Sequence, residues 1–308
     1  MTIKYRLELI KRLSGKTQEK LAAELEVSFP TLNSWINGKS IPRKDAWQRI
    51  DELYLHLTGQ NVVAGSLIEA KKLGILKKRQ ELPKILKLLE NRKDLYDQYL
   101  LSLTYNTNRI EGSTLTEPET SAILFQNAAL PDKSIIEQIE VKNHQAAFGY
   151  MMRHLSGQYK ISEEFICKLH SILMNGIRED AGHYRNHRVR IAGSNVPTAN
   201  YLKVPVLMKA LVEDILTGNE DKIGFASKIH SRLEQVHPFS DGNGRIGRLL
   251  LTSMMLKEGL PPAIISQGQR RLYILYLNQS QIGGDYSRLE NFICDAVLAG
   301  YDVLKNMQ

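Results

Sequence analysis

Apolar residues recur at helical spacing along most of this 308-residue chain, which predicts an all-α, mainly helical fold. Ile229, Leu233 and Val236 follow one another at intervals of four and three residues, as they would on one face of a helix. The clearest exception is the segment 182–197, where apolar and polar residues alternate around 189–191 and a glycine-containing turn follows. We therefore expect helices throughout, interrupted by one short β-hairpin.

The length of the sequence and the periodicity of its apolar residues indicate two domains. At roughly 100–200 residues per domain, 308 residues suffice for two. Short amphipathic segments separated by brief turns fill residues 1–57, whereas the pattern weakens after that point among glycines and lysines. We predict a small N-terminal domain at 1–57, a linker and connecting helix at 58–94, and a larger helical domain at 95–308.

Composition narrows the class of protein. The net charge of +8 favours polyanionic or phosphate-bearing partners, although a solvated basic surface gives the same count. Cys167 and Cys294 both follow a Phe-Ile pair, which predicts buried thiols rather than a disulfide framework or a zinc cluster. With no apolar run near 18 residues and no signal-peptide pattern, we expect a cytoplasmic protein without a membrane partner.

The segment 237–248, His-Pro-Phe-Ser-Asp-Gly-Asn-Gly-Arg-Ile-Gly-Arg, lies between two helical patterns and predicts an anion site. Its glycine-containing loop opens directly onto a helix, whose first N–H groups are unpaired and carry partial positive charge. Gly242 and Gly244 let the backbone approach an anion closely. Arg245 and Arg248 are three residues apart, so we expect them to share a helix face and to bind phosphate oxygens.

Two further residues of this segment suit group transfer from a polyphosphate. Asp241 directly precedes the anion loop and can supply a carboxylate to Mg²⁺. His237 is the local candidate for the base that a hydroxyl acceptor requires, because its unperturbed pKa is near ~6.5. The sequence contains no Gly-x-x-x-x-Gly-Lys-Ser/Thr phosphate loop, and His230 lies seven residues from His237, unlike the paired histidines of zinc hydrolases.

Residues 237–248 match, at every specified position, the signature that the Fic family carries, His-x-Phe-x-Asp/Glu-Gly-Asn-Gly-Arg-x-x-Arg, and the chain therefore resembles that family. The resemblance implies a nucleotidyltransferase that moves AMP from MgATP to a Tyr, Thr or Ser hydroxyl of a target protein or of itself. It implies His237 as the catalytic base, Phe239 as the loop anchor and Asp241 as the Mg²⁺ ligand. It further implies ATP contacts by Ser240, Asp241, Gly242, Asn243, Gly244, Arg245 and Arg248.

Two other segments resemble parts of the same family. Gly182-His-Tyr-Arg, followed by Val189-x-Ile191-x-Gly193-Ser194, resembles its flap hairpin, which aligns the target chain beside the nucleotide. The segment 270–286 resembles its C-terminal helices, where an aromatic residue and an amide border the adenine. Tyr273 and Gln281 are the candidates for these positions. The resemblance thus implies a Fic-type helical core with a short β-hairpin flap.

The segment Thr107-Asn-Arg-Ile-Glu111-Gly112 resembles the inhibitory motif of the family, Ser/Thr-x-x-x-Glu-Gly/Asn. Thr107 and Glu111 are four residues apart and share a helical face, and Gly112 is a natural helix stop, so we expect an inhibitory helix near 104–112. A carboxylate paired with Arg248 would remove the group meant for the γ-phosphate and place negative charge there. In some relatives the same Glu supports removal of AMP, and that activity stays open here.

The segment 17–42 reads as two helices joined by a tight turn and resembles the helix-turn-helix of phage repressors. Glu26 stands at the turn, where glycine is common, so we expect a strained or an altered turn. The expected core consists of Leu21, Ala22, Leu25, Val27, Leu32, Trp35 and Ile36. Binding to DNA would place residues 28–37 in the major groove. The candidate DNA contacts are Thr31, Asn33, Ser34 and Lys39.

Three functions are consistent with these patterns. The first is an auto-inhibited protein adenylyltransferase with a DNA-binding appendage. The second is a DNA-binding transcriptional regulator whose Fic domain senses nucleotide. The third is phosphate transfer, which the intact Gly-Asn-Gly loop disfavours because the kinase-like members of the family lack it. The N-terminal segment also fits a docking or dimerisation module, which leaves a homodimer open.

Overall fold

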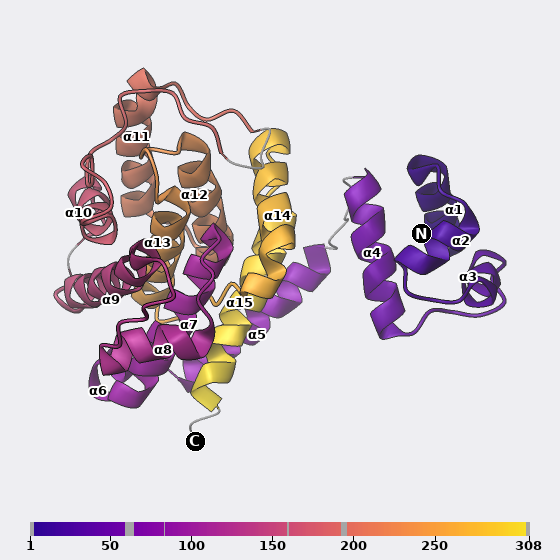
Figure 1. Cartoon of the computed structure of the whole chain (residues 1–308), viewed down its shortest axis with the longest axis horizontal. Helices are drawn as coiled ribbons and strands as arrows, with labels where there is room; N and C mark the ends of the chain where they lie inside the picture. Colours follow the sequence, from indigo (N-terminus) through magenta and orange to yellow (C-terminus); the bar gives the residue numbers. More distant parts are fainter. Residues whose placement is uncertain (1–2, 59–64, 83, 159, 192–195, 306–308) are drawn as a thin grey trace. The chain divides into compact units, whose positions relative to one another are not determined.

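The computed structural model describes residues 3–58, 65–82, 84–158, 160–191 and 196–305. Helices dominate these residues, and no strand forms within them, so the prediction of a mainly helical protein is confirmed. The chain divides into two compact units, Met1–Val63 and Ala64–Gln308. Each unit is drawn in Figure 1. Within the described ranges, no helix is both long enough and apolar enough to cross a membrane.

The first unit is a four-helix domain, α1 (Ile3–Ser14), α2 (Gln18–Glu24), α3 (Phe29–Ile36) and α4 (Lys44–Thr58). Six of the seven core residues expected in its helix-turn-helix are buried, and Val27 is partly buried against the same core. The turn after α2 is strained rather than altered, because Glu26 adopts a left-handed φ of 54° that glycine would adopt freely. Thr17 and Ser28 cap α2 and α3 through their hydroxyl groups.

The second unit is a helical bundle built around α12 and α13. In chain order it contains α5 (Gly65–Glu81), α6 (Ile85–Asn91), α7 (Lys93–Glu111), α8 (Glu117–Gln126), α9 (Ile135–Ser156), α10 (Glu163–Leu173), α11 (Val204–Thr217), α12 (Lys222–Val236), α13 (Asn243–Lys257), α14 (Arg270–Gly283) and α15 (Ser287–Lys305). Short 3₁₀ turns, η1 (Tyr201–Lys203) and η2 (Gln267–Gln269), precede α11 and α14. Helix α13 contacts α7, α9, α10 and α12, and Figure 1 shows it inside the bundle. A helix covered on all sides is apolar around most of its circumference.

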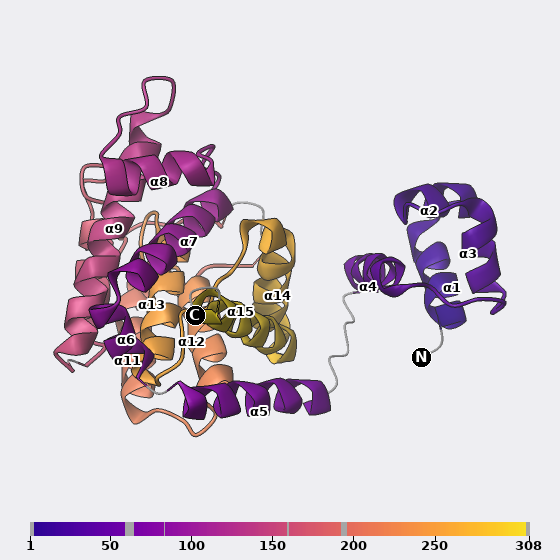
Figure 2. The ribbon, with the colours of Figure 1, turned by 90° about the horizontal axis from the view of Figure 1, so that it is seen from below.

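The segment expected as a linker contains a well-packed helix. Helix α5 contacts α15, and the two lie side by side in Figures 1 and 2. Ile68 and Ile75 are buried. The Lys72 ammonium pairs with the Glu290 carboxylate of α15 and also with the Asp221 carboxylate, at an N–O distance of 2.6 Å. The periodicity of α5 is weak because lysines, rather than apolar residues, make part of its contact with the bundle. The connecting helix expected here is divided between α6 and the first part of α7.

The β-hairpin expected at 182–197 is not formed among the described residues of that segment. Val189 and Ile191 lie in a chain without regular structure, and Gly193 and Ser194 fall outside the described residues. The two limbs are joined by a side-chain bond, since the Thr198 hydroxyl donates to the Val189 carbonyl at 2.9 Å. Alternation of residue types thus predicted a hairpin that the described residues of this segment do not form.

Candidate active site

The loop between α12 and α13 is closed by its own asparagine. The Phe239 N–H donates to Asn243 Oδ1 at 2.9 Å, and Asn243 Nδ2 donates back to the Phe239 carbonyl at 2.9 Å. Both residues are buried. His237 and Gly242 turn the chain at the two ends of the loop with left-handed φ values of 50° and 74°. The loop is thus a rigid entry to α13, whose first N–H groups are available to an anion.

Arg185 holds the backbone that carries His237. Its guanidinium is buried and donates to the carbonyls of His237 at 2.7 Å and of Val236 at 3.2 Å. The same group also bonds the carbonyl of His187, within the segment expected as the flap, and the carbonyl of Ala199, two residues beyond that segment. The Gly182-His-Tyr-Arg segment was predicted to introduce the flap. The structure shows that its arginine joins the base of that segment to the catalytic loop.

His237 is held in the form that a general base requires. Its Nδ1 lies 3.2 Å from the Glu234 carbonyl. A carbonyl only accepts, so Nδ1 carries the proton and Nε2 keeps its lone pair. Burial lowers the pKa of His237, and the charge of Arg185 acts in the same direction, against the bond to Glu234 and the charges of Glu111 and Asp241. The imidazole is therefore neutral at neutral pH.

A cavity of about 290 Å³ opens above this loop and α14. It brings together eleven of the residues predicted for the site and its regulation. These are Glu111, Ile191, His237, Ser240, Asp241, Gly242, Asn243, Gly244, Arg248, Tyr273 and Gln281. The lining is polar at the start of α13 and apolar at Ile274 and Leu277 of α14. This division suits a ligand with a phosphate end and an aromatic end.

Arg245 does not occupy the position predicted for it. Its side chain is buried, pairs with Glu140 of α9 at 2.7 Å, and is absent from the described cavity lining. Arg248, three residues later, turns instead toward α7. The prediction that Arg245 and Arg248 share a binding face is wrong because α13 is surrounded by helices. Each arginine extends toward the partner on its own side of the helix. A direct phosphate contact by Arg245 is therefore not supported.

Arg248 is engaged by both residues of the predicted inhibitory motif. Its Nη2 pairs with Glu111 Oε1, and its Nε donates to Thr107 Oγ1 at 2.7 Å. A Cβ added at Gly244 would collide with Glu111 Oε1, so the carboxylate lies directly against the anion loop. Burial raises the pKa of Glu111, but the charge of Arg248 and its hydrogen bond outweigh burial, and the pKa is lowered overall. Glu111 is therefore ionised at neutral pH and lies against the loop predicted to bind phosphate.

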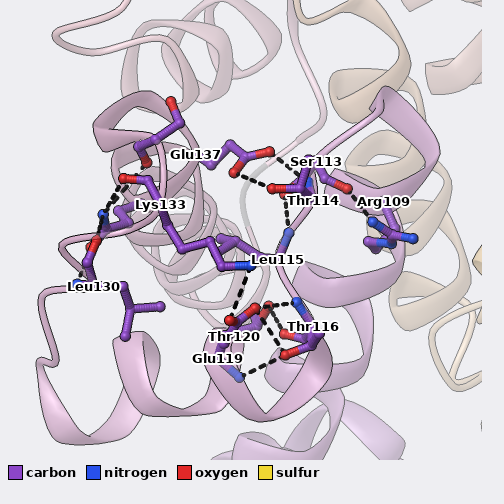
Figure 3. Close-up of polar contacts among 12 residues, drawn as sticks. Arg109, Ser113, Thr114, Leu115, Thr116, Glu119, Thr120, Leu130, Lys133 and Glu137 are labelled. Atoms are coloured by element: carbon purple, nitrogen blue, oxygen red, sulfur yellow. Dashed lines mark hydrogen bonds and ion pairs between the residues drawn. The ribbon is translucent and has the colours of Figure 1, made fainter.

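The end of α7 is anchored just beyond Glu111 (Figure 3). Gly112 ends the helix with a φ of 107°, and the Arg109 guanidinium donates to the Ser113 carbonyl at 2.5 Å. Thr114 then donates through its N–H and its hydroxyl to the two carboxylate oxygens of Glu137 on α9, at 2.5 and 2.9 Å. These bonds join the exit of the helix that carries Glu111 to α9.

The turn into α8 continues this anchored segment. Thr116 and Glu119 form a capping box, and Lys133 pairs with the same glutamate at 3.1 Å. All three residues appear in Figure 3. On the side of α14, Arg270 donates to the Ile110 carbonyl at 2.6 Å. The C-terminal turn of α7 is consequently held from both sides.

Glu234 lines the cavity although the sequence patterns did not single it out. Its residue is only 7% exposed, and its Oε1 has no hydrogen-bond partner among the described residues. Burial raises its pKa to about 7, against the opposing charge of Arg248 and with a further rise from Glu111. The sequence feature that could have indicated Glu234 is a lone carboxylate between Leu233 and Val236, in a helix turn that is otherwise expected to be buried.

Replacing Glu234 by glutamine is expected to stabilise the fold more at pH 8 than at pH 5. The folded-state pKa is raised from 4.5 to about 7, so the folded protein holds the proton more tightly than the unfolded chain does. Stability therefore falls as pH rises from 4.5 through 7, by at most about 3 kcal/mol. Thermal unfolding of both proteins at the two pH values measures this. Equal differences in melting temperature at pH 5 and pH 8 would contradict the assignment.

Tyr273 and Gln281, the candidates for the adenine end, are both committed to neighbouring helices. The Tyr273 hydroxyl lies 2.7 Å from His230 Nε2, and its ring lies 5.9 Å from the Arg248 guanidinium. Gln281 donates from Nε2 to the Ser231 carbonyl at 3.1 Å. Both line the cavity, with Tyr273 buried beneath Arg248.

Ser240 and Asp241 differ in what their side chains contact. The Ser240 hydroxyl donates to Asp180, whose pKa falls to about 2 through its bonds with Arg178 and Ser240. Asp241 lines the cavity beside the anion loop. Among the described residues, no three His, Cys, Asp or Glu side chains gather as a metal cage. A single carboxylate beside a phosphate site fits Mg²⁺, which binds one or two carboxylates together with substrate phosphates and water.

The residues predicted to contact DNA lie on the outer side of α3. Thr31, Asn33 and Ser34 are partly exposed, opposite the buried Leu32, and Lys39 is exposed. Their polar groups bond locally: Thr31 with Ser28 at 2.8 Å, Ser34 with Ser40 at 2.7 Å, and Asn33 with Asn37 at 2.9 Å. The helix thus presents a polar surface with its basic residue just after its end.

Two segments of the chain match known protein families. Residues 160–255 match the Fic/DOC family, and residues 7–54 match a helix-turn-helix family. A protein adenylyltransferase Fic from Nematostella vectensis is 34% identical over 196 residues, which cover 62% of this chain and 44% of the relative. A second, from Drosophila willistoni, is 31% identical over 209 residues, covering 66% and 40%. The chain therefore spans less than half the length of these relatives.

Solved structures agree on the fold. Residues 134–508 of Fic-1 from C. elegans superpose with a TM-score of 0.67 at 24% identity, covering 94% of this chain and 85% of that one. A Fic-domain signalling protein from Bacteroides thetaiotaomicron gives a TM-score of 0.63 at 22% identity, covering 78% and 98%.

Proposed function

This chain carries a Fic domain and an N-terminal helix-turn-helix domain, and we propose that it transfers AMP from ATP to a Tyr, Thr or Ser hydroxyl of a protein, itself included. One observation carries the proposal. A neutral His237, the N-terminus of α13 and Arg248 converge on a single cavity. The relatives named as adenylyltransferases support the same reaction.

The chain's own groups account for each part of this reaction. His237 Nε2 takes the proton as the target oxygen attacks the α-phosphorus, and the bond from that phosphorus to pyrophosphate breaks. The N–H groups at the start of α13 hold the phosphates, and Arg248 binds the terminal one once Glu111 has left it. Asp241 is the residue that would hold Mg²⁺, which neutralises charge between neighbouring phosphates.

The resting enzyme is proposed to be auto-inhibited. Glu111 and Thr107 engage Arg248, and the Glu111 carboxylate lies against Gly244, where a phosphate must bind. Since the pKa of Glu111 is lowered, this contact is present above the ordinary value of 4.5 and is lost only as pH falls through the lowered pKa. Acidification toward pH 5 is therefore no route to activation.

The position of Glu111 also suits removal of AMP. Its side chain is 39% exposed and lines the cavity, so the carboxylate can orient water toward an AMP ester bound there. Purified AMP-modified protein, freed of ATP, is expected to release AMP in the presence of the wild-type chain. The Glu111→Gly protein is expected to release none. Equal release by both proteins would remove this second activity from the proposal.

Labelled nucleotides test the transfer directly. The Glu111→Gly protein is incubated with a cell lysate and ATP that carries its label on the α-phosphate or, separately, on the γ-phosphate. Relative to the control, Glu111→Gly combined with His237→Ala, additional labelling of protein from the α-position only is expected. Additional labelling from the γ-position would indicate phosphate transfer by this chain. Absence of both labels, with operator binding that responds to ATP, would favour the nucleotide-sensing regulator.

Replacing Thr107 by valine is expected to raise auto-modification about 3–10-fold. The change removes the hydroxyl that accepts from Arg248 Nε but keeps a β-branched side chain, and the roughly 0.5–1.5 kcal/mol that a hydrogen bond contributes net corresponds to this range. Thr104→Val is the matched control, because Thr104 lies one turn earlier on α7 and bonds His144 instead of Arg248. Intact mass after incubation with MgATP measures both. Equal activation by the two variants would contradict the assigned role of Thr107.

DNA binding by the N-terminal domain is a second proposed function, favoured by the polar, exposed outer side of α3. Selection of binding sites from random duplexes, followed by titration at several salt concentrations, tests it. Asn33→Ala is expected to relax sequence preference, whereas Lys39→Ala is expected to lower the salt dependence by about one counterion. If DNA retention does not depend on salt, or if the selection enriches no sequence, the domain is instead a docking or dimerisation module. Sedimentation would then identify a dimer.

A further inference from the structure

His170 belongs to α10, far from the signature in sequence, yet it contacts the catalytic loop. The residue is 1% exposed and both ring nitrogens are bonded. The Gly182 N–H donates to His170 Nδ1 at 2.8 Å, and His170 Nε2 lies 3.0 Å from the Asp241 carbonyl. A backbone N–H only donates and a carbonyl only accepts, so Nδ1 is the acceptor and Nε2 carries the proton. The surroundings therefore select one neutral tautomer.

The imidazole is also packed against the loop. Its ring stacks on Phe239 at a centroid distance of 3.7 Å and an angle of 6°. A Cβ added at Gly242 would lie only 3.5 Å from His170 Nε2. Consequently one side chain contacts three residues between 239 and 242, including the backbone of the residue proposed to hold Mg²⁺.

The other ring nitrogen, Nδ1, bonds the segment that begins at Gly182. Gly182 has a φ of 88°, and a Cβ there would meet the Ser171 Cβ at 2.9 Å, so its chain passes close against α10. Three residues later, Arg185 bonds the His237 carbonyl. His170 thus joins the segment that holds His237 to the loop that carries Asp241.

We propose that His170 is a positioning residue for AMP transfer, which holds the Asp241 carbonyl through Nε2–H and the start of the Arg185 segment through Nδ1. This inference rests on the proposed function of the site. A phenylalanine at 170 would preserve the stack on Phe239 but leave a buried N–H and a buried carbonyl unpaired. The Asp241 carbonyl bond fixes the backbone from which the carboxylate and the neighbouring N–H groups extend.

Two substitutions by amide side chains test the two hydrogen bonds of His170 one at a time. His170→Gln places its terminal nitrogen near the position of Nε2 and keeps the donor to Asp241. His170→Asn places its oxygen near the position of Nδ1 and keeps the acceptor for Gly182. In the Glu111→Gly background, we expect His170→Asn to need about 10–100-fold more Mg²⁺ for half-maximal auto-modification, as outer supports of metal ligands typically do. His170→Gln is expected to stay within about threefold of the parent in Mg²⁺ requirement.

A binding measurement is independent of turnover. Calorimetric titration with a non-hydrolysable ATP analogue, with and without Mg²⁺, is expected to show a smaller gain from Mg²⁺ in His170→Asn and His170→Phe than in His170→Gln. Equal Mg²⁺ dependence in all three variants, or losses that only follow their melting temperatures, would overturn the positioning role. Absence of any AMP adduct in the parent would instead count against the proposed function, while the calorimetric comparison would still decide the role of His170.

Discussion

The Glu111→Gly protein is expected to modify itself with AMP about 10–100-fold faster than the wild-type chain. Glu111 pairs with Arg248 and lies against Gly244, so its removal frees the arginine and takes a negative charge out of the phosphate site. Two like charges about 4 Å apart near a protein surface repel by roughly 4 kcal/mol. The partial exposure of Glu111 reduces this, and about 1.4–2.8 kcal/mol corresponds to the stated range. Intact mass after timed incubation with MgATP measures the rate.

Two further substitutions separate charge from shape. Glu111→Gln keeps the length and the acceptor for Arg248 but loses the charge, and it is expected to activate less than glycine. Glu111→Ala removes the carboxylate while retaining helix propensity, which controls for loosening of the last turn of α7. If neither the glycine nor the alanine variant gains an adduct beyond wild type, the inhibitory role of Glu111 is wrong.

In the activated background, His237→Ala is expected to reduce AMP transfer by about 10²–10⁴-fold, the usual contribution of a general base. Binding of ATP is expected to persist, because the phosphate contacts proposed above come from the start of α13 and from Arg248 rather than from this ring. His237 adopts a left-handed φ of 50°, which asparagine tolerates better than alanine, so His237→Asn controls for backbone strain. Loss of transfer with retained nucleotide affinity in both variants is the expected result. Transfer at the parental rate in either variant would exclude His237 as the base.

The pH dependence provides a second test of His237. Because burial lowers its pKa, the neutral base persists below the ordinary value of 6.5, and the acid limb of transfer by Glu111→Gly is expected below that pH. Glu111 itself raises the pKa of His237, so its removal moves the limb further in the same direction. The acid limb of the rate profile is assigned to His237 if it is absent in His237→Asn. An acid limb at or above pH 6.5 would contradict a buried, neutral imidazole.

The features that sequence predicted correctly are local ones. Helical periodicity identified the core of the N-terminal domain, and the unusual Glu26 marked its strained turn, which the structure shows to be left-handed. Residues 237–248 are contiguous, so the loop, the helix start and His237 could be placed together before any fold was known. The spacing of Thr107 and Glu111 likewise predicted that both lie on one helical face, and in the structure both engage Arg248.

The sequence by itself determined which residues are available to the site, because a contiguous motif needs only local geometry. The tertiary structure alone decided where the longer side chains go. Arg245 turns to Glu140 on α9 because its neighbours on that side differ from those of Arg248. His170 and Arg185 reach the loop across 71 and 52 residues, through bonds to backbone carbonyls that no residue pattern encodes. Side-chain direction on a helix buried all round depends on the surrounding helices, and those neighbours exist only once the chain has folded.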